Sequence, residues 1–168
     1  MAKAKSNKEK VIDLLNEARA SELTGILQYM SQHYELEDMD YGKLAVILKT
    51  IGIDEMRHAE AFADRILFLG GVATSTPDGK VKKGEEIEAM LETDLGLETG
   101  AIEMYNHHAQ ECAKLGDNVS KELFEATLAQ EEGHWDQFSN VHGHIKKLGA
   151  AYLATLAGGQ AEPAAGGA

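Results

Sequence analysis

Four glutamates and two histidines occur in two copies of one spacing pattern. In each copy, a second glutamate follows the first by 33 residues, and a histidine follows that second glutamate at the third position. The six residues are Glu22, Glu55 and His58 in the first copy and Glu98, Glu131 and His134 in the second. Carboxylate oxygens and imidazole nitrogens without thiolates form ligand sets that suit iron or manganese, with zinc as an alternative. Of these metals, only iron and manganese would add electron transfer.

Each of the four glutamates lies on the apolar stripe of a long helical pattern. Glu22 shares its stripe with Leu15, and Glu131 shares its stripe with Phe124 and Phe138. Within each copy the two acids are equidistant from the turn between their helices, so the carboxylates should meet at one height inside a bundle. A buried carboxylate costs on the order of several kcal/mol unless it is compensated. No lysine or arginine lies on these stripes, so two divalent cations would balance the four charges.

A single Glu-x-x-His pair has a simpler interpretation, which is a solvated pair on an exposed helix face. Residues at positions i and i+3 lie on neighbouring parts of a helix surface, so such a pair can also reach one metal ion. Two copies in register, each with a core-facing acid 33 residues earlier, favour the metal site.

Turn and breaker residues divide the chain into four long helical patterns. These patterns cover about residues 8–36, 41–69, 84–114 and 118–148. The turns after the first and third patterns are short, whereas the segment VATSTPDGKVKKG is long enough to travel the length of a bundle. We therefore predict an all-α four-helix bundle with one long crossover between helices two and three.

Two shorter segments follow the four long patterns. The apolar segment AAYLATLA predicts a short fifth helix, which would complete a single domain over residues 1–157. The last residues, 158–168, have the low-complexity composition of a disordered tail.

The composition indicates a soluble protein with a surplus of acidic residues. The chain has 168 residues and a formal net charge of −12, which argues against general nucleic-acid binding and suits a protein that handles cations. No apolar run is long enough to span a membrane and no signal-peptide pattern follows the basic start, so we expect a cytoplasmic protein. The lone Cys112 excludes an internal disulfide and a Cys-rich metal site.

The chain resembles the bacterioferritins, which belong to the ferritin-like di-iron carboxylate group, from about residue 8 to residue 157. The resemblance rests on SELTGILQY, IDEMRHAE, RILFLGG, DLGLE and EEGHWD. It implies a ferroxidase that oxidises Fe(II) with O2 or H2O2 and stores the ferric mineral inside a cage of twenty-four subunits. By position, the family's iron ligands are Glu22, Glu55, His58, Glu98, Glu131 and His134. The resemblance implies that Glu55 and Glu131 bridge the two irons.

The resemblance also implies a haem shared by two subunits, with one axial methionine from each. The matching residue is Met56, which lies about 100° around the helix from the ligand face and would be exposed in a monomer. The alternative is an ordinary methionine that fills space in the core. Thr50 stands where some members carry an inner-surface histidine, which puts an additional iron site there in question. A ferredoxin-type electron donor for iron release is a further implied partner.

Several other residues could support the metal ligands. Tyr29 and Tyr105 each follow a first glutamate at the seventh position, and Tyr29 is the preferred candidate for a hydrogen bond to a ligand carboxylate. Asp54 either orients a ligand histidine or caps the exposed face of its helix. Trp135 is interpreted as packing, although a ring next to His134 could supply an electron. The remaining histidines are interpreted as surface or satisfied residues, namely His33, His107, His108, His142 and His144.

Three other functions are compatible with parts of the pattern. The lysine-rich start, with Lys3, Lys5, Lys8 and Lys10, would suit a DNA-protecting mini-ferritin. A haem-carrying electron-transfer assembly would need Met56 and leave the di-iron site without a role. A di-iron peroxidase is the third alternative, but its relatives carry a Cys-rich iron domain that this chain does not contain. The residues leave open which porphyrin binds and whether O2 or H2O2 is the physiological oxidant.

Overall fold

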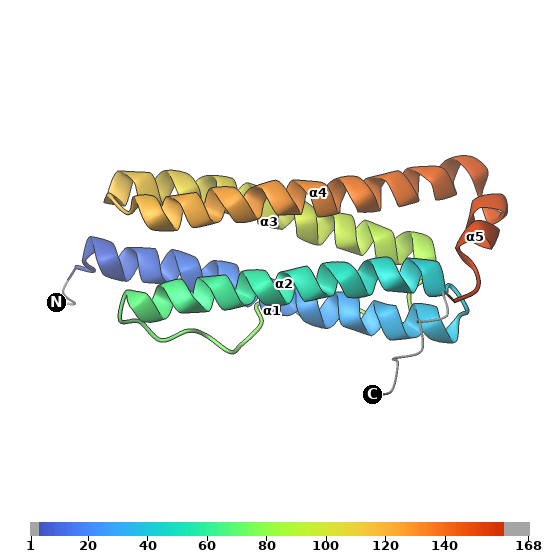
Figure 1. Cartoon of the computed structure of the whole chain (residues 1–168), viewed down its shortest axis with the longest axis horizontal. Coiled ribbons are helices and arrows are strands. Elements are labelled where there is room, and N and C mark those ends of the chain that lie inside the picture. Colours follow the sequence, from blue (N-terminus) through green and yellow to red (C-terminus); the bar gives the residue numbers. More distant parts are fainter. Residues whose placement is uncertain (1–3, 160–168) are drawn as a thin grey trace, which may run out of the picture.

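The computed structural model describes residues 4–159, and the regular structure within this range is helical. Five helices follow one another in the chain: α1 (Asn7–Asp38), α2 (Gly42–Phe68), α3 (Ile87–Leu115), α4 (Asn118–Leu148) and α5 (Ala150–Leu156). The first four form a bundle in which α1 packs mainly on α2 and α3 packs mainly on α4 (Figure 1). The predicted all-α bundle with a short fifth helix is confirmed, and the helix ends agree with the prediction to within three residues.

Some of the predicted features fall at the chain ends. Lys3 and residues 160–168, which make up most of the predicted tail, lie outside the described residues. Within residues 4–159, no helix combines the length and the apolar character that crossing a bilayer would require.

Local side chains set the ends of the long helices. Ser6 and Glu9 form a reciprocal capping box at the start of α1, so two backbone N–H groups of the first turn are satisfied. Helix α3 ends at Gly116, whose φ of 82° is a left-handed conformation that glycine adopts without a Cβ penalty. The Asp117 carboxylate then accepts a hydrogen bond from the Ser120 N–H and caps α4. The tight turn between α3 and α4 therefore follows from two consecutive residues, Gly116 and Asp117.

The crossover between α2 and α3 runs along α1 and returns the chain to the opposite end of the bundle (Figure 1). Polar side chains of α1 bind its backbone at several heights. Asn16 Oδ1 accepts from the Thr74 N–H, and Gln28 both accepts from the Lys82 N–H and donates to the Lys82 carbonyl. As a consequence α2 and α3 run in the same direction, as the length of the crossover predicts.

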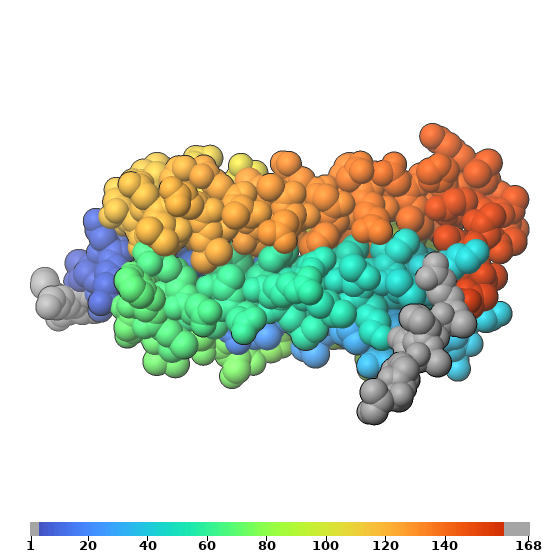
Figure 2. Space-filling model, viewed as in Figure 1, coloured from blue at the N-terminus to red at the C-terminus, as the bar shows by residue number. Residues whose placement is uncertain are grey.

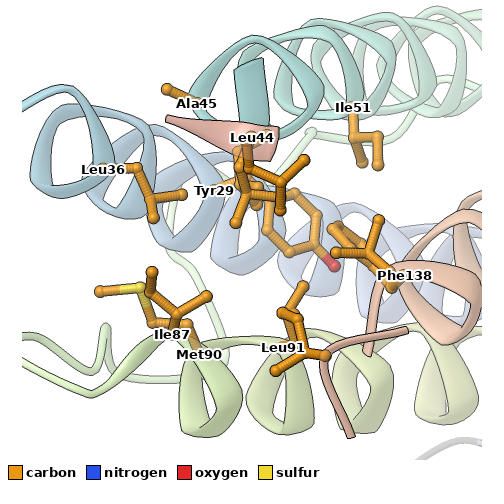
Figure 3. Close-up of a cluster of buried hydrophobic side chains, with 13 residues drawn as sticks. Tyr29, Leu36, Leu44, Ala45, Ile51, Ile87, Met90, Leu91 and Phe138 are labelled. Carbon is orange, nitrogen blue, oxygen red and sulfur yellow. The ribbon is translucent and has the colours of Figure 1, made fainter. Parts of the chain in front are cut away.

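The interior contains two apolar clusters that are separated along the bundle. The cluster near α5 includes Tyr29, Leu44, Leu91 and Phe138, and Figure 3 shows these side chains converging from the four long helices. The cluster at the other end includes Leu15, Phe62, Tyr105 and Phe124. On each long helix, the glutamate of the repeated pattern lies between residues of the two clusters. The bundle therefore places one polar layer between two apolar regions.

Candidate metal centre

The six residues of the repeated pattern lie together in this polar layer, and each of them is buried. Each long helix contributes one glutamate, and α2 and α4 each add a histidine one turn further along. His58 Nδ1 lies 3.0 Å from Glu55 Oε2 and 2.9 Å from Glu131 Oε1. His134 Nδ1 lies 3.1 Å from Glu55 Oε1 and 3.5 Å from Glu131 Oε2. Both rings thus direct Nδ1 inward and are related by the repeat.

The ligand atoms fall into two overlapping groups that are each small enough to hold one metal ion. One group is made of Glu22, Glu55, His58 and Glu131, and the other is made of Glu55, Glu98, Glu131 and His134. Glu55 and Glu131 belong to both groups, whereas Glu22 and Glu98 each belong to one. Two ions held in these groups would therefore share the two glutamates of α2 and α4.

A small cavity of about 20 Å³ lies between the four carboxylates. Two tyrosines also line it, and each donates a hydrogen bond across the bundle to a glutamate of the other half. Tyr29 Oη lies 2.5 Å from Glu98 Oε1, and Tyr105 Oη donates to Glu22 Oε1. The sequence favoured Tyr29 over Tyr105, but the two hydroxyls make equivalent contacts. Both tyrosines are therefore candidates for supporting the carboxylates.

The ionisable groups of the layer shift one another's pKa values. Burial raises the pKa of Glu22 and of Glu98 well above the usual range. Burial acts in the same direction on Glu55 and Glu131, but hydrogen bonds from the two histidines outweigh it and lower both pKa values, that of Glu55 to about 2. Burial disfavours a charged His134, yet hydrogen bonds to Glu131 and Glu55 raise its pKa to about 9. Cations that bind here therefore compete with protons.

A further observation indicates that this set of donor atoms fits divalent metal ions. Glu98 Oε2 is buried and has no hydrogen-bond partner within the described range. Buried polar atoms are normally satisfied, so an atom without a partner at this depth indicates a missing ligand or ion. Oxygen and nitrogen atoms in this arrangement suit iron, manganese or zinc.

The outer nitrogens of the two rings face residues that precede the shared glutamates. His134 Nε2 lies 3.9 Å from Asp54 Oδ2, so the predicted partner of a ligand histidine is near the ring but beyond hydrogen-bond distance. The sequence predicted no such partner for the His58 ring, yet His58 Nε2 lies 3.1 Å from Gln130 Oε1. The repeat contained this signal, because Gln130 precedes Glu131 as Asp54 precedes Glu55.

Other predicted residues lie away from the layer. Met56 is 45% exposed on α2, as expected from its position beside the ligand face. The Thr50 hydroxyl donates to the Val46 carbonyl, so it is occupied within its own helix. Trp135 is partly exposed and donates to the Thr99 hydroxyl. Among the remaining histidines, His33 and His108 are fully buried.

One buried acid was not singled out from the sequence. Asp94 is completely buried on α3, one turn before Glu98, and neither of its carboxylate oxygens has a hydrogen-bond partner within residues 4–159. Gln32 of α1 lies in the same region, and its Oε1 is also without a partner there. Asp94 lies on the apolar stripe of its helix, and an acid on that stripe was the feature of the sequence that could have indicated its burial.

Comparison with known proteins places this geometry in a family. Residues 12–148 match the Ferritin family model, which describes a ferritin-like domain. The chain is 49% identical over 151 residues to the bacterioferritin of Desulfovibrio desulfuricans, covering 90% of this chain and 84% of that protein. It is 36% identical over 140 residues to the bacterioferritin of Brucella melitensis, covering 83% of this chain and 87% of that protein.

Solved structures agree with the sequence comparison. The X-ray structure of Desulfovibrio desulfuricans bacterioferritin, which describes its diiron site in different catalytic states, matches with a TM-score of 0.90 at 46% identity and covers 96% of each chain. The Mycobacterium tuberculosis bacterioferritin matches with a TM-score of 0.84 at 32% identity, covering 88% of this chain and 94% of that one. With its fold and its sequence both matched over most of their length, the chain belongs to the bacterioferritin family of proteins with a ferritin-like domain.

Proposed function

We propose that this protein is a ferroxidase that oxidises Fe(II) to Fe(III) at a di-iron site within each subunit and stores the ferric product. The observation that carries the proposal is the pair of overlapping ligand groups, which share Glu55 and Glu131 inside the bundle. Glu22 with His58 would hold one iron, and Glu98 with His134 would hold the other. The two shared glutamates would bridge them.

Two irons in this set would each supply one electron to the oxidant, O2 or H2O2. The protein's carboxylates would neutralise the positive charge of the irons, and the enclosed site would keep bulk water out. Because the pKa values of the two histidines and of the two unshared glutamates, Glu22 and Glu98, are raised, iron binding must release protons from the layer. Two apolar clusters enclose the layer on both sides, which strengthens every electrostatic interaction within it.

Removal of a shared glutamate tests the site. Glu55→Ala and Glu131→Ala should each abolish fast aerobic Fe(II) oxidation, measured by stopped-flow absorbance, while the assembly keeps its size in gel filtration. Glu122→Ala, which changes an exposed acid of α4, is the matched control and should oxidise Fe(II) at the parental rate. Unchanged oxidation in both shared-glutamate variants would refute the assignment of the site.

We also propose that haem binds between two subunits and that Met56 of each subunit would hold its iron. The exposure of Met56 supports this, because a haem and a second subunit would cover it. Leu27 is also exposed, and the Met30 side chain lies beside Gly52, one turn before Met56, so the neighbouring surface is apolar. Met56→Leu should remove the haem bands from the visible spectrum of the purified protein. Met39→Leu, at a similarly exposed methionine, should keep them, and haem bound normally to Met56→Leu would contradict the proposal.

The storage function requires an assembly, and we propose a cage of twenty-four subunits. Large apolar side chains are exposed where α2 ends and α4 begins, which supports a contact between subunits at that end. They are Leu67, Phe68, Val72 and Val119. Mass measurement of the native protein tests the number of copies, and a stable monomer would contradict it. The cytoplasmic location remains a prediction from the sequence pattern, and the ferredoxin-type electron donor remains a prediction from the resemblance.

One lysine of the basic start, on which the DNA-protecting alternative depends, is paired within the chain. Lys5 Nζ lies 2.6 Å from Asp13 Oδ2, so this charge is already paired. A gel shift with duplex DNA at moderate salt should show no retention.

A further inference from the structure

The residues that precede the two shared glutamates meet the histidines of the opposite half. Gln130 of α4 contacts the outer nitrogen of His58 on α2, and Asp54 of α2 approaches the outer nitrogen of His134 on α4. Both pairs bridge α2 and α4, the helices that lie side by side on the face shown in Figure 2. The repeat thus produces the same arrangement twice, with an amide on one side and a carboxylate on the other.

The contact between Gln130 and His58 has a defined polarity. Gln130 Nε2 donates to the Ala126 carbonyl at 3.4 Å, which leaves Oε1 to face His58 Nε2 at 3.1 Å. An amide oxygen only accepts, so His58 Nε2 must carry the proton. His58 Nδ1, which faces the carboxylates, is then the nitrogen that offers a lone pair to a metal ion.

The other histidine is held less firmly. The 3.9 Å separation between His134 Nε2 and Asp54 Oδ2 exceeds a hydrogen bond. The Asp54 carboxylate instead accepts a hydrogen bond from Arg57 on its own helix. Asp54 therefore makes no hydrogen bond to His134 Nε2 that would fix the orientation of the ring.

From this difference, we propose that Gln130 is a positioning residue that orients His58, and that it makes the metal position at Glu22 and His58 the tighter of the two. The inference rests on the proposed di-iron site and deepens it by ranking its two halves. An outer partner that fixes the tautomer and orientation of a ligand histidine is worth roughly 10–100-fold in metal affinity. The carboxylate at Asp54 does not supply this to His134, because the distance is too long.

Titration of the metal-free protein with Co(II), followed by visible absorption, measures this ranking directly. The parental protein should bind two Co(II) per subunit in two resolved steps. Gln130→Ala should weaken the tighter step roughly 10–100-fold and bring the two steps together. Gln130→Glu keeps an oxygen acceptor on the same side chain and should restore the tighter step. Gln137→Ala, at another exposed glutamine of α4, should bind as the parent does.

The outcomes separate this inference from the proposed function. Two normal binding steps in Gln130→Ala would overturn the role of Gln130 and leave the di-iron site standing. If Gln130→Ala weakens the tighter binding step and Gln130→Glu does not restore it, the role of Gln130 would also be overturned, because the loss of affinity would then not come from the missing acceptor. A parental protein that binds no Co(II) would overturn the di-iron site, and this inference with it. Circular dichroism confirms that each variant keeps its helices.

Discussion

Helices α1 and α2 form one half of the bundle, and α3 and α4 form the other. The two halves carry the same arrangement of side chains at equivalent positions. A shift of 76 residues relates Glu22 to Glu98 and Glu55 to Glu131, and it also relates Tyr29 to Tyr105. Each tyrosine crosses to the other half, so each half supports the carboxylate of its partner. The likeness teaches that the candidate metal layer depends on both halves at once, since each half receives a hydrogen bond to one of its glutamates from a tyrosine of the other half.

The two halves differ where the repeated positions carry other residues. Gln130 corresponds to Asp54, Glu132 corresponds to Met56, and the buried Asp94 corresponds to Ala18. These positions surround the ligands without being among them. The set of candidate ligands is thus symmetric, whereas the surrounding residues distinguish one candidate metal position from the other and one outer surface from the other.

The largest expected effect tests the packing that both halves share. Phe62 packs against Tyr105 and Phe124, and Phe138 packs against Tyr29, all with ring centroids 5.2–5.6 Å apart. Phe62→Ala and Phe138→Ala should each lower the free energy of unfolding by about 3–5 kcal/mol in chemical denaturation. The Phe62 variant should lose more, because its ring has two aromatic partners. A larger loss for Phe138→Ala would break this part of the comparison.

Removing the two crossing hydroxyls tests whether the halves support each other equally. Tyr29→Phe and Tyr105→Phe should each weaken Co(II) binding by roughly 10–100-fold, because the carboxylate that each hydroxyl orients loses its donor. The effect is read from the same visible-absorption titration. Tyr34→Phe, at an exposed tyrosine of α1, is the control and should bind as the parent does. An effect from only one of the two buried tyrosines would show that the support is one-sided.

Asp94 tests a feature that only the second half contains. Burial raises the pKa of Asp94 well above its usual range, so the folded chain holds this proton at pH values where the unfolded chain has lost it. Stability is therefore lost as pH rises from the ordinary pKa of aspartate through the raised one. Asp94→Asn, which stays neutral, should be more stable than the parent by on the order of 2 kcal/mol above neutral pH. Urea midpoints at pH 5 and pH 8 check this, and a variant that is destabilised at both would contradict it.

The smallest expected effect concerns the buried His108, whose equivalent position in the first half is Gln32. Burial lowers the pKa of His108 to about 4, and His107 adds to this, although Glu17 Oε2 lies 3.3 Å from Nε2. The unfolded chain therefore binds this proton first as pH falls, and stability is lost between the ordinary histidine pKa and about 4. His108→Gln should reduce the loss between pH 7 and pH 5 by about 1 kcal/mol. Thermal melts at the two pH values measure it, and an unchanged difference would argue against a neutral buried ring.

Much of the fold was predictable because its determinants are local. Helix periodicity, the turn residues at Gly116 and Asp117 and the length of the crossover each act over a few residues of chain. The predicted helix limits and the parallel course of α2 and α3 followed from them. The six candidate ligands could be selected because the repeat places them at equal distances from two turns, which local geometry converts into one height in the bundle.

The contacts across helices could not be selected in this way. Tyr105 was ranked below Tyr29, and neither Gln130 nor Asp94 was recognised, because each depends on which side chain of another helix lies opposite. Gln130 occupies the repeat position that corresponds to Asp54, but whether its side chain reaches a histidine 72 residues away depends on how α2 and α4 pack. An acid on an apolar stripe likewise shows its burial only when the neighbouring helix covers it.

The sequence by itself determined the helical architecture and the set of six candidate ligands, because helix period and repeat spacing are properties of the chain. Only the tertiary structure decided how the two histidines differ, with His58 held at 3.1 Å by Gln130 and His134 lying 3.9 Å from Asp54. The physical reason is that a hydrogen bond is lost within less than an ångström, and a difference of that size is set by the packing of two helices against each other.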